Sequence, residues 1–193
     1  MRVIAGKVGG RKLHAPKGMD TRPTPDRVRE ALFSMLLPHL AGARVLDLYA
    51  GSGALGIEAL SRGAAHATFV EQGRAALTAL QANLAALSLA HKDISSVIAA
   101  PVLQGLSRLG QIRQQFGLIL MDPPYAQNLV PQTLEAVVEG ALLAPGGMVV
   151  AEHAGKSPSP AAPHPLQCID LRRYGDVAVS IYTAPSPQGE ADS

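Results

Sequence analysis

The most specific chemical motif of the 193-residue chain is Met121-Asp122-Pro123-Pro124-Tyr125. Two consecutive prolines remove two backbone N–H donors and force an extended, rigid loop. The Asp122 carboxylate and the Pro123 carbonyl are thereby left as hydrogen-bond acceptors, and Tyr125 adds a flat aromatic face. Two acceptors beside a ring suit a planar group that bears an exocyclic amine. The structural alternative is a Pro-Pro turn that ends a strand and exposes a tyrosine.

A second motif, Gly51-Ser52-Gly53-Ala54-Leu55-Gly56, fits the pattern G-x-G-x-x-G. It follows a β-type run and precedes a helical pattern, so its glycines would let the backbone approach a ligand at a helix N-terminus. Glu71 ends the next β-type run, where a carboxylate can accept hydrogen bonds from both ribose hydroxyls of a nucleoside cofactor. Taken alone, the motif also fits a nicotinamide dehydrogenase or a purely structural turn.

Asp47 lies four residues before the glycine motif. A carboxylate there would crowd a pyrophosphate, but it suits a ligand with positive charge. S-adenosylmethionine is such a ligand, since it carries a sulfonium and an ammonium group. The same carboxylate could instead hold the loop by accepting backbone N–H groups. The sequence leaves both roles for Asp47 open.

The composition excludes several protein classes. Hydrophobic residues make up 47% and charged residues 17%, which excludes wholesale disorder. A single cysteine, Cys168, excludes a disulfide framework and a cysteine-based zinc site, and the six histidines have no ligand spacing, so we expect no metal. No apolar run approaches the roughly 18 residues of a membrane span. The N-terminus also lacks the apolar stretch of a signal peptide, and we expect a cytoplasmic protein.

The net charge of +2 is unevenly distributed along the chain. Residues 1–30 hold eight of the 17 basic and three of the 15 acidic residues, which gives this segment +5 and the remainder −3. Arg27 and Arg29 lie near the start of a predicted helix, where cations oppose the helix dipole. The distribution predicts a polyanionic partner for the N-terminal segment, with a solvated charged tail as the alternative.

The elements that must position these motifs follow from the hydrophobic periodicity. We expect a short hairpin over 1–20 with its turn at Gly9-Gly10, then a helix of about a dozen residues that begins at Pro25 with Thr24 as N-cap. Five β-type runs alternate with helical patterns, which predicts an α/β fold with a parallel sheet. The runs span 44–50, 66–71, 95–100, 117–122 and 146–153, and the helical patterns 54–63, 73–90, 102–115 and part of 129–143.

The C-terminal part of the chain has a different pattern. Residues 166–184 contain two strand-like runs joined at Tyr174-Gly175-Asp176 without a helix, which predicts an antiparallel hairpin that closes the parallel sheet. Residues 155–165 form a Pro/Ser-rich loop to which we assign no chemistry. Residues 185–193 have the composition of a disordered tail.

In its D-P-P-Y motif and its glycine motif, the chain resembles a class I S-adenosylmethionine-dependent methyltransferase of the amino-methylating D-P-P-Y type. It is more specifically similar to the RsmD family, which methylates the N2 amine of guanine 966 in 16S ribosomal RNA. The resemblance implies a Rossmann-like class I methyltransferase fold, a mostly parallel seven-stranded sheet that ends in an antiparallel hairpin, with a small N-terminal β-hairpin extension. The stretches that carry it are 1–13, 21–33, 46–63, 70–71 and 122–125.

The resemblance also implies roles for parts of the chain. Residues 1–24 would contact RNA, 25–184 would form the methyltransferase domain, and 185–193 the tail. The implied partner is ribosomal RNA within a small-subunit assembly intermediate, bound by a monomer. The implied catalytic residues are Asp122, Pro123, Pro124 and Tyr125. S-adenosylmethionine would bind at Asp47, Tyr49, Ala50, Gly51, Ser52, Gly53, Leu55, Glu71, Gln72, Val102 and Asp122. RNA would contact Arg2, Lys7, Arg11, Lys12, Arg22, Thr24, Arg27 and Arg29.

Pro101 departs from the family pattern, because the end of the third strand usually carries Asp or Asn to bind the adenine amine. The Val102 N–H or the Ala100 carbonyl would have to replace that side chain. Two alternative functions stay open. One is an adenine-N6 methyltransferase of DNA or RNA, which the D-P-P-Y motif also fits. The other is a non-catalytic ribosome-assembly protein that binds RNA, which Pro101 would favour. A dehydrogenase is disfavoured because D-P-P-Y has no role in hydride transfer.

Overall fold

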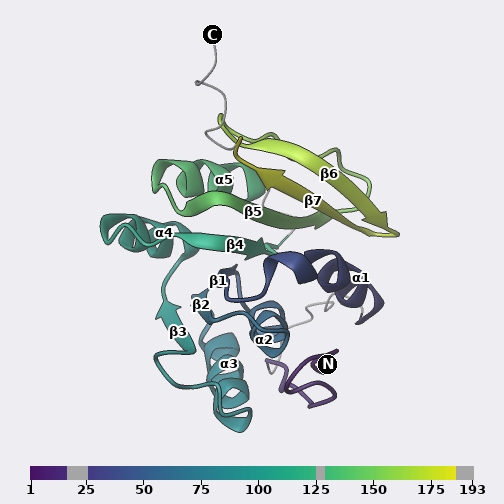
Figure 1. Ribbon diagram of the computed structural model, residues 1–193, viewed down its shortest axis with the longest axis vertical. Coiled ribbons are helices and arrows are strands. Elements are labelled where there is room, and N and C mark those ends of the chain that lie inside the picture. The colour runs from purple at the N-terminus through teal and green to yellow at the C-terminus, as the bar shows by residue number, and fades with distance from the viewer. Residues whose placement is uncertain (17–25, 125–128, 186–193) are drawn as a thin grey trace.

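The structure, a computed structural model, describes residues 1–16, 26–124 and 129–185. Arg22, Thr24 and Tyr125, to which the sequence analysis gives roles, lie outside the described residues, as does the predicted tail from residue 186 on. The described strands form one sheet of seven strands in the order β3-β2-β1-β4-β5-β7-β6 (Figure 1). Their bounds are Arg44–Leu48 for β1, His66–Glu71 for β2, Ser95–Ala99 for β3, Phe116–Met121 for β4, Leu143–Ala154 for β5, Gln167–Tyr174 for β6 and Val177–Thr183 for β7.

The central strands are apolar along most of their length because helices cover both of their faces. β1, β2 and β4 are buried at nearly every position, the pattern typical of parallel strands in an α/β sheet. β1 pairs in parallel with β2 and β4, β2 with β3, and β4 with β5. β7 pairs antiparallel with β5 and with β6. The predicted α/β fold, a mostly parallel sheet that ends in an antiparallel hairpin, is confirmed.

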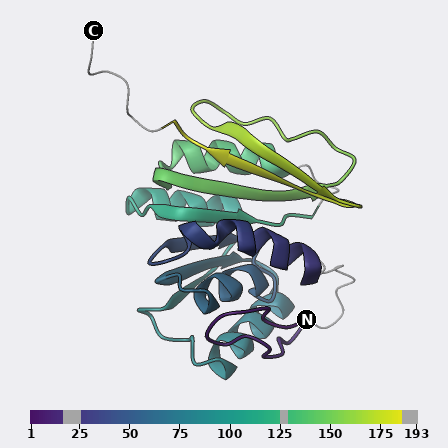
Figure 2. The same cartoon turned by 45° about the vertical axis from the view of Figure 1, so that its right-hand side comes forward.

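The helices form two layers, one on each face of the sheet. Apolar side chains of α1, α2 and α3 share one core cluster, and those of α4 and α5 share the other. In Figure 2, α1 crosses in front of the sheet with the N-terminal segment below it. The helices span Asp26–Leu36 for α1, Ala54–Ser61 for α2, Arg74–Ala86 for α3, Val102–Gln111 for α4 and Leu129–Glu139 for α5, with a short 3-10 turn, Leu37–His39, after α1.

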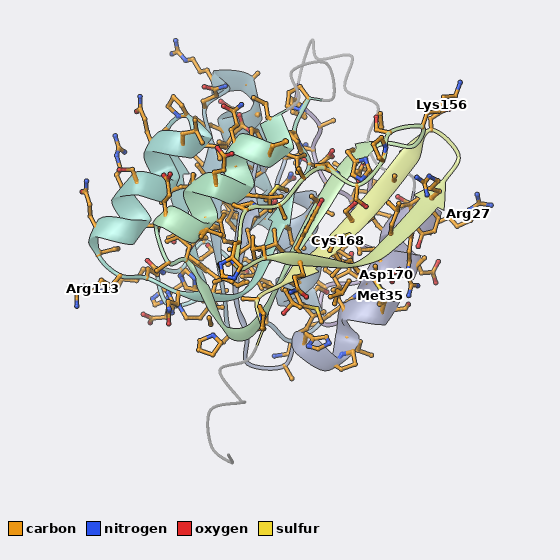
Figure 3. All side chains as sticks on the ribbon, turned by 90° about the horizontal axis from the view of Figure 1, so that it is seen from above. Arg27, Met35, Arg113, Lys156, Cys168 and Asp170 are labelled. Atoms are coloured by element: carbon orange, nitrogen blue, oxygen red, sulfur yellow. The ribbon has the colours of Figure 1, made fainter. Side chains whose placement is uncertain are left out.

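The loop of residues 155–165 packs on the same face as α4 and α5, against the hairpin. The Tyr182 hydroxyl of β7 donates to the Pro160 carbonyl at 2.9 Å, and the Ser180 hydroxyl donates to that of Ser159 at 3.1 Å. Ala162 packs against the apolar cluster of that face. In Figure 3, which views the molecule from above, the hairpin crosses in front of α1. The loop, which had no predicted role, therefore covers the hairpin where the polypeptide crosses from β5 to the outer strand β6.

The two sides of the predicted N-terminal hairpin run antiparallel but do not form a regular ladder of strand pairs. Residues 1–16, which we call the arm, include one isolated bridge between Arg2 and Lys12. Their turn is wider than predicted, because Gly9 N–H donates to the Gly6 carbonyl at 3.1 Å and Gly6 has a φ of +85°. Val3 and Leu13 are buried in the core cluster of α1, α2 and α3. The arm is therefore packed onto the domain that follows it. The boundary predicted at residue 24 lies outside the described residues.

Within the described residues, no helix has the length and apolar character that a membrane crossing would need.

Candidate functional site

The register of the parallel strands brings the predicted carboxylates to one edge of the sheet. Leu48 of β1 is level with Val70 of β2 and with Met121 of β4. Asp47 comes just before this level, and Glu71 and Asp122 come just after it. Ligands of open α/β sheets bind outside the carboxyl ends of the strands. The candidate site therefore lies at this edge, between β1, β2 and β4.

Asp47 is 1% exposed and forms a hydrogen bond to the backbone of the glycine motif. Its Oδ2 accepts a hydrogen bond from the Gly56 N–H at 2.8 Å, in the first turn of α2. Burial raises the pKa of Asp47 to about 8, the Gly56 N–H opposes this shift, and the negative charge of Glu71 adds to it. Of the two roles left open by the sequence, the structure contains the loop-holding one.

Glu71 ties the glycine motif to the turn that follows β2. Its Oε2 accepts from the Gly51 N–H at 2.8 Å, and its Oε1 accepts from the N–H groups of Gln72 at 2.8 Å and Gly73 at 2.6 Å. A carboxylate has about four acceptor positions, so about one remains for a ligand. The predicted pair of bonds to two ribose hydroxyls would therefore compete with one of these backbone bonds.

The three glycines of the motif serve different purposes. Gly51 has a φ of +57°, and a Cβ there would meet only the Tyr49 carbonyl oxygen at 3.9 Å, so its surroundings are open. A Cβ on Gly53 would lie 2.4 Å from a Leu80 methyl carbon, and one on Gly56 would lie 2.4 Å from the Phe69 ring. Gly53 and Gly56 therefore allow close packing of the helix, whereas Gly51 leaves the backbone approachable.

The predicted cofactor residues around these glycines divide between backbone and side-chain roles. Tyr49 has a φ of +58°, and its hydroxyl lies 2.7 Å from the Thr133 hydroxyl of α5. Burial raises the pKa of Tyr49, and the bond to Thr133 partly opposes this. The Tyr49 side chain is thus occupied by α5, and only its backbone belongs to the loop. Ala50 and Ser52 are buried, and Leu55 is half-buried at the start of α2.

At the end of β3, Pro101 is the N-cap residue of α4. The Ala100 N–H donates to the Glu71 carbonyl at 3.0 Å, which fixes this end of β3 beside β2. Val102 begins α4 with a buried side chain, and its N–H is one of the first-turn groups that have no partner within a helix. Gln72 is exposed next to this strand end. The replacement of a side chain at Pro101 by the Val102 N–H or the Ala100 carbonyl stays a prediction.

The D-P-P-Y motif directly follows buried β4, as predicted. Asp122 is half-buried, Pro123 is buried and Pro124 is exposed. Tyr125 lies outside the described residues. Asp122 therefore lies at the same sheet edge as the glycine motif. Among the residues that the structure describes, no three His, Cys, Asp or Glu side chains gather as metal ligands.

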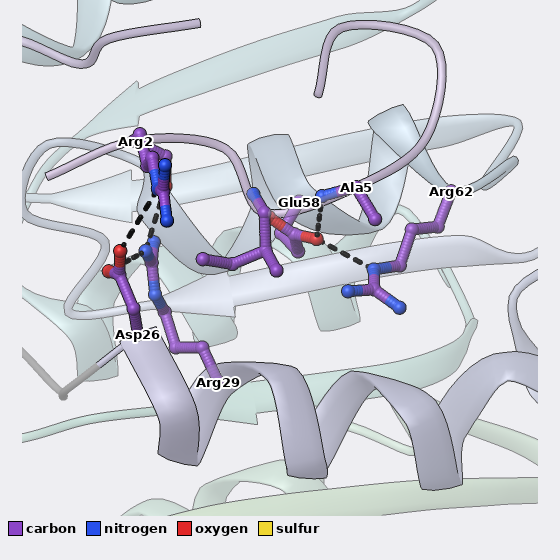
Figure 4. Close-up of polar contacts among 7 residues, drawn as sticks. Arg2, Ala5, Asp26, Arg29, Glu58 and Arg62 are labelled. Carbon is purple, nitrogen blue, oxygen red and sulfur yellow. Dashed lines mark hydrogen bonds and ion pairs between the residues drawn. The ribbon is translucent and has the colours of Figure 1, made fainter. Parts of the chain in front are cut away.

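Most of the predicted RNA-contacting side chains that the structure describes are exposed, namely Arg2, Lys7, Arg11, Lys12 and Arg27. Arg29 requires a correction, because its side chain is 1% exposed. Its Nη2 donates to the Arg2 carbonyl at 2.8 Å and to Asp26 Oδ1 at 2.7 Å (Figure 4). Arg29 therefore joins the arm to the start of α1, and its side chain is too buried to meet a phosphate at the surface. The sequence could not distinguish exposed Arg27 from buried Arg29, because both lie near the start of the same helix.

Two buried polar residues of α2 that the sequence analysis did not single out hold the arm. Glu58 is 0% exposed, and its carboxylate accepts from the N–H groups of Ile4 at 2.7 Å and Ala5 at 3.1 Å. It also pairs with Arg62 at 2.6 Å, as Figure 4 shows. The Ser61 hydroxyl accepts from the Val8 N–H at 3.1 Å. A charged residue on the apolar face of a short helix was the available signal for Glu58.

Asn83 of α3 holds the arm at its other end. Its Oδ1 accepts from the His14 N–H at 2.7 Å, and its Nδ2 donates to the His14 carbonyl at 3.0 Å. The same Nδ2 donates to the Ser52 carbonyl at 2.9 Å. One buried amide therefore contacts both the arm and the glycine motif. An Asn in an amphipathic helix carries no sequence signal for such a contact.

Comparisons with known proteins extend over nearly the whole chain. A family model described as conserved hypothetical protein 95 matches residues 1–183. YlbH of Bacillus subtilis (strain 168) is 38% identical over 182 residues, which cover 94% of this chain and 98% of YlbH. Ribosomal RNA small subunit methyltransferase D of Escherichia coli (strain K12) is 36% identical, with 100% and 94% covered. The solved structure of YhhF from Escherichia coli is 33% identical with a TM-score of 0.82, and 95% and 97% are covered.

Proposed function

Because the chain belongs to the family described as conserved hypothetical protein 95, the RsmD family, we propose that it methylates a guanine of 16S ribosomal RNA. The family makes the protein an RNA methyltransferase with a class I methyltransferase fold. The proposed acceptor is the N2 amine of guanine 966, and the proposed methyl donor is S-adenosylmethionine. The proposed cofactor-binding, catalytic and RNA-contacting residues are those of the sequence analysis, except Arg29.

The observation that carries this proposal is the position of Asp122 and Pro123 directly after β4. They lie at the same sheet edge as Glu71 and the glycine motif. A carboxylate and a proline-fixed carbonyl at this point can accept both hydrogens of an exocyclic amine. A cofactor bound over the neighbouring loop would then lie beside that amine.

The residues around the glycine motif fit S-adenosylmethionine. Gly51 leaves its surroundings open, and the N-terminus of α2 has first-turn N–H groups that can meet the cofactor's carboxylate. Glu71 keeps about one acceptor position for a ribose hydroxyl. Val102 N–H or the Ala100 carbonyl would meet the adenine edge in place of a side chain at Pro101.

When bound, S-adenosylmethionine would supply a methyl group on a positive, readily displaced sulfur. The protein must then activate a poor nucleophile, since the N2 lone pair is delocalised into the guanine ring. Asp122 and the Pro123 carbonyl accept hydrogen bonds from the amine, which localises and orients that lone pair. The same fixed acceptors stabilise the positive charge that builds on the nitrogen. The methylated amine would be strongly acidic and would release its proton to the Asp122 carboxylate or to solvent. Tyr125 stacks on the flipped-out base, which is worth about 1–3 kcal/mol.

The proposed RNA contacts come from the arm and the start of α1. Lys7, Arg11, Lys12 and Arg27 are exposed there, and Arg2 is exposed beside Asp26. We further propose that a monomer acts in the cytoplasm on RNA held in a small-subunit assembly intermediate. The three substrates can be distinguished by measuring the rate of methyl transfer to naked RNA, to the assembly intermediate and to the whole subunit.

The test is mass mapping of methylated nucleosides in ribosomal RNA from a strain that lacks this protein. We expect the loss of one N2-methylguanosine from 16S ribosomal RNA and its return when the wild-type chain is expressed. Loss of an N6-methyladenosine instead would favour the adenine-specific alternative. An unchanged set of modified nucleosides, together with impaired subunit assembly, would favour the non-catalytic alternative.

A further inference from the structure

Asn83 contacts two parts of the molecule that have separate proposed tasks. Its side chain is 1% exposed. On one side it pairs with the backbone N–H and carbonyl of His14, at the end of the arm. On the other side it donates to the carbonyl of Ser52, inside the glycine motif. Both N–H groups of its amide are therefore used, one for each part.

The other contacts of the arm differ from this one. Glu58 and Ser61 hold residues 4–8 of the arm, and both lie in α2 beyond the glycine motif. They fix the arm without a hydrogen bond to residues 51–53 among the described contacts. Ser61 therefore serves as a matched comparison for Asn83, since it anchors the arm but does not contact the loop.

The geometry allows the arm to influence the loop. An amide group is planar, so the pair of bonds to His14 sets the orientation of its whole plane. That orientation determines where the second N–H points, and hence whether the Ser52 carbonyl keeps its partner. Ser52 lies between Gly51 and Gly53, both with positive φ, where the backbone depends on such contacts to keep one conformation.

We infer that Asn83 is a positioning residue that couples RNA binding by the arm to cofactor binding by the glycine motif. RNA that binds the arm would further restrain His14, and with it the orientation of Asn83, and so preform the loop. Because coupling between two sites is reciprocal, a bound cofactor would tighten RNA binding by the same factor. This inference rests on the proposed function, since it takes RNA and S-adenosylmethionine as the two ligands.

The test measures the affinity for a fragment of 16S ribosomal RNA with and without S-adenosylhomocysteine, the product form of the cofactor. In the wild-type chain we expect the cofactor to tighten RNA binding at least about fivefold. The ratio of the RNA affinity with S-adenosylhomocysteine to that without it should fall to about one in Asn83→Ala. In Ser61→Ala the RNA affinity should fall while the ratio stays at the wild-type value.

Three results would overturn the inference. They are a wild-type ratio of one, a wild-type ratio retained by Asn83→Ala, and an equal loss of the ratio in Ser61→Ala. If the wild-type chain binds both ligands and methylates RNA without coupling, only this inference fails. If it binds neither ligand, the proposed function fails as well.

A second measurement uses the wild-type chain and does not depend on how the variants fold. The His14 amide hydrogen is bonded to Asn83, and the Val8 amide hydrogen is bonded to Ser61. We expect S-adenosylhomocysteine to slow hydrogen exchange at His14 at least fivefold while leaving the Val8 rate unchanged. Equal slowing at both amides, or none at His14, would contradict the coupling through Asn83.

Discussion

At the scale of single residues, the two aspartates at the sheet edge differ in their surroundings. Asp47 is almost fully buried beneath the glycine motif and accepts from the Gly56 N–H. Asp122 is half-buried and lies between the end of β4 and the proline pair. Burial favours the neutral form of a carboxyl group and raises the pKa of Asp47. Asp47 is therefore suited to hold the loop, and Asp122 to receive the amine of a substrate.

We expect Asp122→Ala to lower the rate of methyl transfer at least about a hundredfold, because one preorganised acceptor for the reacting amine is lost. The affinity for S-adenosylhomocysteine, measured by calorimetry, should change by less than about threefold. Asp93→Ala is the matched control, since Asp93 is exposed before β3, at the opposite sheet edge. Full activity in Asp122→Ala would contradict its proposed role.

The raised pKa of Asp47 predicts a specific dependence of stability on pH. In the folded chain Asp47 keeps its proton up to about pH 8, whereas the ordinary value is 3.8. Between these values the folded state binds more protons than the unfolded state, so stability falls as pH rises. One proton corresponds to about 1.4 kcal/mol per pH unit.

Asp47→Asn removes this titration and keeps an oxygen that can accept from the Gly56 N–H. We expect the free energy of unfolding of the variant to gain about 2–3 kcal/mol on the wild-type value between pH 5 and pH 7. Urea unfolding at several pH values measures both chains. Parallel stability profiles would mean that Asp47 is ionised in the folded protein.

At the scale of elements, α2 serves both the glycine motif and the arm. Its first turn carries Gly56, and its later residues Glu58 and Ser61 accept backbone N–H groups of the arm. Val3 and Leu13 add apolar contacts from the arm to the same core cluster. The arm is thus held by a helix whose own start forms part of the candidate cofactor site.

We expect Glu58→Gln to destabilise the chain by about 1–3 kcal/mol, because the half-buried Arg62 loses its charged partner and two N–H groups lose a strong acceptor. Glu135→Gln, on the exposed side of α5, is the control and should leave stability unchanged within about 0.5 kcal/mol. Urea unfolding gives the free energies. Limited proteolysis should show earlier cleavage of residues 1–16 in the Glu58 variant alone.

At the scale of the whole molecule, the exposed basic residues described in the arm and at the start of α1 lie apart from those of α4. Arg27 is labelled on the side of Figure 3 opposite to Arg113, which follows α4. The arm itself lies beside α2 and α3 in Figure 1. Residues 31–193 carry −3 and the first thirty residues +5, so the two parts of the chain have opposite charge balance. Such a division suits a polyanion at the arm and a cationic cofactor at the sheet edge.

We expect replacement of Lys7, Arg11 and Lys12 by alanine to flatten the salt dependence of RNA binding. Each lost phosphate contact lowers the slope of log affinity against log salt by about 0.7–0.9. Arg108 and Arg113, exposed on and after α4, supply the control variant with two charges removed elsewhere. If both variants keep the wild-type slope, the arm is a solvated charged segment and does not contact RNA.

The sequence by itself predicted the identity and order of the elements along the chain. β2 spans the predicted residues 66–71, and β4 differs from its predicted run by one residue at each end. Such elements are encoded by local periodicity, which each segment carries alone. The two motifs were readable for the same reason, since their glycines and prolines act on the backbone where they stand. Asp122 and Glu71 accordingly lie at the predicted sheet edge.

Only the tertiary structure decided which distant segments meet. It inserted β7 between β5 and β6, joined buried Arg29 of α1 to the backbone of Arg2, and gave Asp47 its bond to Gly56. It also joined Asn83 to both His14 and Ser52. These contacts connect residues that are far apart in the chain or on different elements, and their partners leave no periodic pattern. The residues of the candidate site can therefore be predicted from short sequence motifs. The connection between the arm and the site depends on how the whole chain packs.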